Sequence, residues 1–129
     1  MINYGFTKEM DIPYGRVIEQ VREALKNEGF GILTEIEVKE KMKEKLGLDM
    51  RKYIVLGACN PPNAYKAILA EENIGLMLPC NVIVYEKGSK TVLSVIRPTV
   101  AMKMIDNGKL QKIAEAVEGP LKKVFDAIK

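Results

Sequence analysis

The stretch VIVYEKGSKTVLSVI, residues 82–96, decides the fold. Residues 82–85 and 91–96 are rich in β-branched side chains, and Gly88 lies in the connection between them. Two such segments joined by a short turn that contains glycine predict a β-hairpin. An antiparallel hairpin interrupts the regular strand–helix alternation of a doubly wound nucleotide-binding sheet, so we expect an α+β fold instead.

The chain before the hairpin predicts two strands and two helices. Residues 2–10 are typical of a strand, and Asp11-Ile12-Pro13 favours the start of a helix that Gly29 ends. That helix has one apolar stripe, formed by Tyr14, Val17, Ile18, Val21 and Leu25. Residues 30–33 predict a second strand. Thr34 and Glu37 have the spacing of a capping box, so we expect a short helix after them, ending at Gly47.

The remaining segments complete the expected order of elements. Residues 53–59 are an uninterrupted apolar run, typical of a central strand covered on both faces. Pro61 and Pro62 favour a helix that starts at Asn63 and buries Ala64, Ile68 and Leu69.

A final helix is expected over residues 107–128, with a kink or a break into two helices at Gly119-Pro120. The sequence therefore predicts an α+β two-layer sandwich in a single domain, residues 1–129. Its core would have the order β-α-β4-α, with a mainly antiparallel sheet and short inserted helices.

Composition excludes several classes of function. The chain has 129 residues, 20 Lys and Arg against 17 Asp and Glu, two Cys and no His. Without His, a Ser-His-Asp triad, a Cys-His pair and a His-based metal site are impossible. The net charge of +3 is too small to predict binding to nucleic acid or to an anionic membrane. No stretch without a charged residue, 74–85 included, is long enough to cross a bilayer.

The N-terminus lacks the basic start and apolar segment of a secretory signal, and the two cysteines suit a reducing compartment. We therefore expect a cytoplasmic protein.

Three segments resemble a known family: GFGILTEI at 29–36, GACNPPNA at 57–64 and GLMLPCNVIVYE at 75–86. They are similar to the family called domain of unknown function 302. The resemblance implies a β-α-β4-α fold of the TATA-binding-protein-like class and a homodimer. It implies no activity and no catalytic residue, and a fold class does not by itself imply DNA binding.

Two Cys-Asn dipeptides beside proline are the candidate site: Cys59-Asn60 before Pro61, and Cys80-Asn81 after Pro79. The first closes a predicted strand and the second opens one. If the two strands are antiparallel neighbours, both sulfurs lie at the same rim of the sheet. We therefore predict a site formed by Cys59, Asn60, Cys80 and Asn81.

Several interpretations of these residues are open. Cys59 and Cys80 could bind a soft metal such as Cu(I), which two thiolates can satisfy, or form a reversible disulfide. They could also be small buried side chains without a chemical role. Asn60 and Asn81 could face a ligand at a pocket rim or form local turns with their own backbone.

The prediction that follows is a ligand-binding module for a small molecule or a soft metal, with catalysis not expected and the ligand or cofactor unknown. The alternative is a thiol-dependent redox protein or enzyme that uses Cys59 or Cys80. Because the chain has no His, that thiolate would depend on Lys, Arg or the helix opening at residues 61–63 to lower its pKa. A third possibility is an interaction protein without a pocket.

Overall fold

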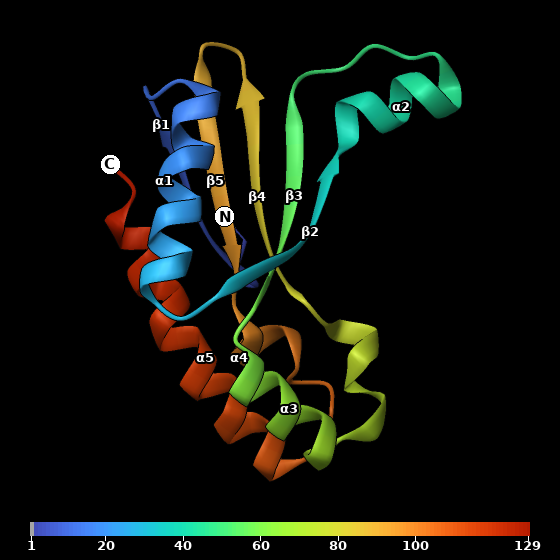
Figure 1. Cartoon of the computed structure of the whole chain (residues 1–129), viewed down its shortest axis with the longest axis vertical. Coiled ribbons are helices and arrows are strands. Elements are labelled where there is room, and N and C mark those ends of the chain that lie inside the picture. The colour runs from blue at the N-terminus through green and yellow to red at the C-terminus, as the bar shows by residue number, and fades with distance from the viewer. Residues whose placement is uncertain (1) are drawn as a thin grey trace.

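The chain forms one five-stranded antiparallel sheet with helices around it, as described by a computed structural model of residues 2–129 (Figure 1). The strands lie in the order β1-β5-β4-β3-β2. The elements are, in chain order, β1 (Gly5–Met10), α1 (Tyr14–Asn27), β2 (Gly31–Glu37), α2 (Val38–Leu46), β3 (Tyr53–Cys59), α3 (Pro61–Ala70), the 3-10 helix η1 (Glu72–Met77), β4 (Cys80–Lys87), β5 (Lys90–Ile96), α4 (Pro98–Ala101) and α5 (Gly108–Ala127).

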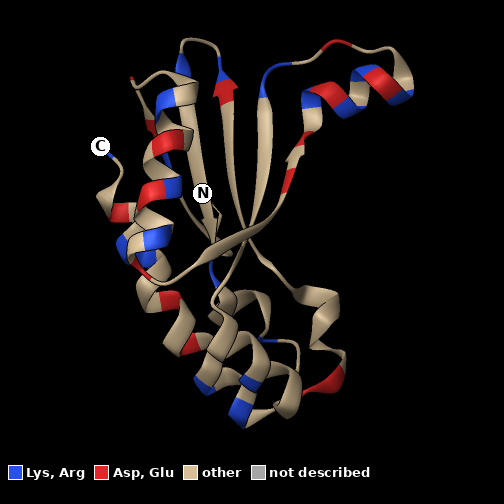
Figure 2. Cartoon of the chain, viewed as in Figure 1, with Lys and Arg blue, Asp and Glu red and all other residues tan. Residues whose placement is uncertain are grey.

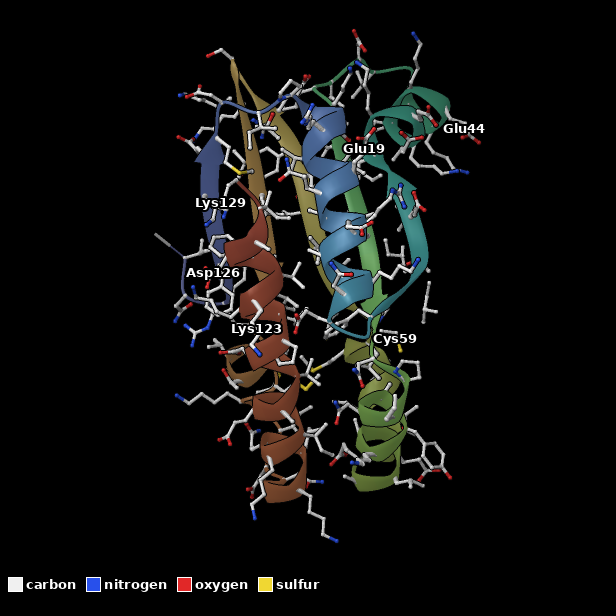
Figure 3. The ribbon with its side chains drawn as sticks, turned by 60° about the vertical axis from the view of Figure 1, so that its left-hand side comes forward. Glu19, Glu44, Cys59, Lys123, Asp126 and Lys129 are labelled. Carbon is white, nitrogen blue, oxygen red and sulfur yellow. The ribbon has the colours of Figure 1, made fainter. Side chains whose placement is uncertain are left out.

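The main core lies between the sheet and the two long helices, α1 and α5, which cover the same face (Figures 1 and 3). Side chains alternate between the two faces of a strand, so every second residue of β3, β4 and β5 points into this core. The fully buried members from these strands and helices include Val17, Val21, Leu25, Leu56, Val82, Val84, Leu93, Val95, Leu121 and Val124. The predicted α+β two-layer sandwich is confirmed.

A second, smaller cluster lies beyond the ends of the strands. Its buried residues are Ala67, Ile74, Met102, Leu110 and Ala114. They come from α3, η1, the α4 region and the first half of α5, which gather at the lower end of the molecule in Figure 1. The inner face of α5 therefore contributes to both clusters, Leu110 and Ala114 to the smaller one and Val117, Leu121 and Val124 to the main core.

In the described part of the chain, no helix covers the other face of the sheet. Tyr53 and Tyr85, which are paired on β3 and β4, stack there with ring centroids 5.1 Å apart. The edge strand β2 and helix α2 extend away from the body (Figure 1), and α2 contributes no buried residue. Leu33 and Ile36 on β2 are exposed.

The hairpin and most boundaries agree with the sequence-based prediction, but the segment around residue 34 does not. Thr34 to Glu37 belong to β2, where they pair with β3 after a bulge between Ile32 and Thr34. The capping box is therefore wrong: the residue before α2 is Glu37, and it makes no side-chain capping bond. The backbone N–H and C=O groups of residues 34–37 find their hydrogen-bond partners in β3, whereas a capping box would have bonded the backbone within the segment itself.

Three further expectations need correction. β3 is an inner strand of the sheet, as expected, but the long helices cover it on one face and not on both. Ile68 and Leu69 are exposed, and Ala67 is the buried residue of α3. A single helix, α5, continues through Pro120, so this segment does not break into two helices. Among residues 2–129, no helix has both the length and the apolar character needed to cross a lipid bilayer.

Candidate functional site

A cavity of about 310 Å³ lies between the two apolar clusters. Its walls come from the ends of β3 and β4, from α3, and from the middle of α5. The lining residues include Phe30, Ala58, Cys59, Ala64, Ala67, Cys80, Met102, Ile113, Ala114 and Val117. Most of the inner wall is buried, whereas Leu33 and Ile68, which also line the cavity, are exposed and mark its opening to solvent.

The strand register brings both cysteines to this cavity. β3 and β4 are antiparallel neighbours, and Cys80 lies opposite Ala58, the residue before Cys59. Cys59 ends β3 directly above α3, as Figure 3 shows, and is half-buried, whereas Cys80 is 8% exposed. Both residues line the cavity. The expected proximity of the two strand ends is therefore present in the fold.

Asn60 has a structural role at this site. It is the N-cap of α3, and its Oδ1 accepts hydrogen bonds from the backbone N–H of Asn63 at 3.2 Å and from Nδ2 of Asn63 at 3.1 Å. Its own Nδ2 donates to the carbonyl oxygen of Gly29 at 3.5 Å. Asn60 and Asn63 line the cavity, but these bonds already satisfy the side-chain oxygen of Asn60.

Asn81 does not line this cavity. It pairs with Gly57 and is exposed, and it borders a neighbouring hollow of about 270 Å³. Because successive strand residues point to opposite faces, Cys80 faces inward and Asn81 outward. Cys80, Pro79 and Met102 border both spaces. The predicted four-residue rim is thus divided, with Cys59, Asn60 and Cys80 at one cavity and Asn81 at the other.

The surroundings of the two thiols favour the protonated form. Burial raises the pKa of Cys80 to about 11, with a smaller contribution from the negative charge that Cys59 would carry. Burial also raises the pKa of the Cys59 thiol. A nucleophilic cysteine needs the opposite change, a lowered pKa caused by a cation, a helix N-terminus or a metal. Neither raised pKa favours a nucleophilic thiolate.

Disulfide and multi-ligand metal chemistry have little support in the described residues. Cys59 and Cys80 are both free, and no disulfide bond joins them. Within residues 2–129, no three or more His, Cys, Asp or Glu side chains come together in a way that could hold a metal ion. A four-coordinate zinc site would require such a group. A two-coordinate Cu(I) site would require the two thiols alone.

Charge is absent from the cavity wall. None of the residues that line it is Lys, Arg, Asp or Glu, and its polar side chains are limited to the two cysteines, Asn60 and Asn63. In Figure 2 the charged residues gather on α1, α2 and the outer side of α5, whereas the region where β2, β3 and β4 cross is uncharged. Such a wall suits an apolar ligand, because burying an ionised group without a partner is costly.

Sequence reasoning did not assign Phe30, Met102 or Ala114 to this site. Ala64 was expected on the buried side of its helix, where a small residue indicates either close helix packing or empty space. Met102 is an ordinary core residue by type. The only signal in the sequence was the presence of alanine at inner positions of α3 and α5, and it could not distinguish the two cases.

The chain is similar over nearly its whole length to proteins of one family. Residues 6–128 match the family described as Domain of unknown function DUF302. The crystal structure of an uncharacterized conserved DUF302 protein from Bacillus stearothermophilus has 31% sequence identity and a TM-score of 0.90, over 98% of each chain. No curated protein matches the sequence.

Proposed function

The chain belongs to the DUF302 family, whose description assigns no activity, and we propose that it is a binding module for a small organic molecule. The ligand occupies the cavity between β3, α3 and α5. The observation that carries this proposal is a cavity of about 310 Å³ with an uncharged wall. Ligand sites in proteins are mostly apolar clefts of about 300–1,000 Å³ with few polar groups.

The size of the cavity supports binding of a whole molecule. Voids in protein interiors are generally small, because side chains pack as closely as organic crystals. An engineered apolar cavity of about 150 Å³ stays dry and binds benzene. The cavity here is about twice as large. In this proposal Cys59, Asn60 and Cys80 form part of the ligand's wall, and Asn81 lies outside it at the neighbouring hollow.

We expect a neutral fluorescent probe, N-phenyl-1-naphthylamine, to bind with a saturable rise in emission, one molecule per chain. The Ala114→Leu substitution should weaken this binding at least about tenfold, because the larger side chain takes up space that the probe needs. Ala114 is 2% exposed and lines the cavity. Fluorescence titration measures both affinities.

Ala116→Leu is the matched control, because Ala116 lies on the exposed side of the same helix. It should leave probe binding unchanged. Ala64→Leu, at a half-buried position of α3 that also lines the cavity, repeats the test if Ala114→Leu does not fold. Equal binding by the parent and both cavity variants would exclude this cavity as the site.

Cu(I) is the second candidate occupant, because Cys59 and Cys80 line one cavity and lie close enough for the charge of one to affect the pKa of the other. Cu(I) binds thiolates, so it would release both protons, and the raised pKa values make this costly at neutral pH. Competition with a Cu(I) chelator measures the affinity. Equal binding by the Cys59→Ser/Cys80→Ser variant would exclude this candidate, as would the absence of tighter binding at higher pH.

Self-association is a further part of the proposal. The helix-free face of the sheet, with Tyr53 and Tyr85, and the exposed Leu33 and Ile36 of β2 offer apolar surface to a second copy. Sedimentation velocity measures the state directly. A chain that stays monomeric at high concentration would exclude the homodimer.

A further inference from the structure

We infer that the ligand of the cavity is a flat, uncharged aromatic molecule, an inference that rests on the proposed small-molecule function. Three features of the wall lead to it: the absence of charge, the kind of polarisable atoms present, and the shape that the alanines leave.

Uncharged character follows from the lining. No Lys, Arg, Asp or Glu side chain reaches the cavity, and no buried side-chain N or O atom in the described residues lacks a hydrogen-bond partner. A carboxylate or ammonium group entering this space would lose its hydration and gain no opposite charge. Such a loss is among the largest penalties in protein interiors.

The preference for an aromatic ring follows from sulfur. Three sulfur-bearing residues line the cavity, Cys59, Cys80 and Met102, and Phe30 belongs to the same wall. Sulfur makes favourable contacts with the edges of aromatic rings, and rings pair favourably with other rings. A saturated molecule of the same size would gain the dispersion contacts but neither the sulfur–ring nor the ring–ring contacts.

Flatness follows from the short side chains. Ala64 and Ala67 on α3 and Ala114 on α5 line the space, and α3 packs against α5. Alanine has a single methyl group beyond the backbone, so the wall is smooth at these positions and a thin, flat molecule would fit against it. Two fused rings fit both this shape and a volume about twice that of a benzene-binding cavity.

Indane and its saturated counterpart hydrindane form a matched pair of probes, and indane-5-carboxylate adds a charge. Each hydrocarbon is supplied at saturation in buffer, so differences in water solubility cancel and occupancy reports contacts inside the cavity. The methyl resonances of Met102 and the alanines in a ¹³C NMR spectrum measure occupancy. We expect indane to bind about threefold more tightly than hydrindane or better, and the carboxylate at least about a hundredfold more weakly.

Met102→Leu tests the role of sulfur directly. This change conserves volume, so hydrindane binding should persist while the advantage of indane becomes smaller. Met77→Leu is the control, since Met77 does not line the cavity, and it should leave the ratio unchanged. Hydrindane or the carboxylate binding as well as indane would overturn the inference while leaving the proposed function standing. No binding by any hydrocarbon or by N-phenyl-1-naphthylamine would overturn both.

Discussion

Gly57→Ala is expected to destabilise the protein by at least about 3 kcal/mol, at the upper end of what overpacking costs. Gly57 is buried in β3, where it pairs with Thr34 on β2 and Asn81 on β4. A Cβ atom at this position would lie 2.6 Å from Cγ of Pro79 and would collide with Oγ1 of Thr34. Urea denaturation measures the loss as a lower midpoint with an unchanged slope.

Gly31→Ala is the matched control for this prediction. Gly31 is also a strand residue, but a Cβ atom there meets nothing within 4 Å, so its midpoint should stay close to that of the parent. Removing the hydroxyl in Thr34→Ala/Gly57→Ala should recover part of the stability, while the contact with Pro79 keeps the rest lost. If the Gly57→Ala protein kept the parent's urea midpoint, Thr34 and Pro79 would not lie this close to Gly57.

Alkaline pH is expected to weaken the fold through Cys80. Its pKa is raised from 9.0 to about 11 in the folded protein, whereas the unfolded chain ionises near the ordinary value. Below pH 9 both states hold the proton, and between pH 9 and 11 only the folded state does. The folded state then binds more protons, so stability falls as pH rises. The full loss is about 2.7 kcal/mol, since a tenfold change in proton affinity corresponds to about 1.4 kcal/mol.

The measurement is the free energy of unfolding by urea at several pH values in parent and Cys80→Ala protein. Burial also raises the pKa of Tyr14, to about 12, and lowers that of Lys8, but both groups are present in both proteins. The difference between the two curves therefore isolates Cys80. Cys59→Ala is the control and should keep most of the alkaline slope, because Cys59 is more exposed. Parallel curves for parent and Cys80→Ala would contradict the raised pKa.

The elements that the sequence predicted well are those whose pattern is local. The stripe of Val17, Val21 and Leu25 defined α1, and the positive φ of Gly29 (81°) and Gly47 (66°) agrees with glycine at the helix ends. The connection around Gly88 (φ 60°) likewise marked the hairpin.

Elements that depend on partners far away in the chain were not predictable in the same way. Thr34 and Glu37 have the spacing of a capping box, yet pairing with β3 holds them in a strand. A bidentate ion pair between Arg22 on α1 and Glu35 also holds this part of β2. Local propensity cannot report such contacts. Ile68 was expected in the core because of its type, and its exposure at the cavity mouth depends on how α3 sits against α5.

The site was predictable only as far as the chain order of two strands allowed. The ends of β3 and β4 that carry Cys59 and Cys80 lie side by side because the two strands are antiparallel neighbours, which the position of each cysteine at a strand end suggested. The alternation of faces then separated Asn81 from Cys80, and the N-cap bond occupied Asn60. The apolar cavity itself arises from the gap between two clusters of buried residues, a property of tertiary packing that no motif encodes.

Helix α5 joins the two clusters, and this has a consequence for how a bound molecule could leave. The smaller cluster has few buried residues, which places it among the parts of a protein that open most readily. Transient fraying of α3 and of the first turns of α5 would widen the opening at Leu33 and Ile68 while the second half of α5 stays docked on the sheet. A molecule too large for that opening would then leave through partial unfolding of this cluster, without unfolding of the whole protein.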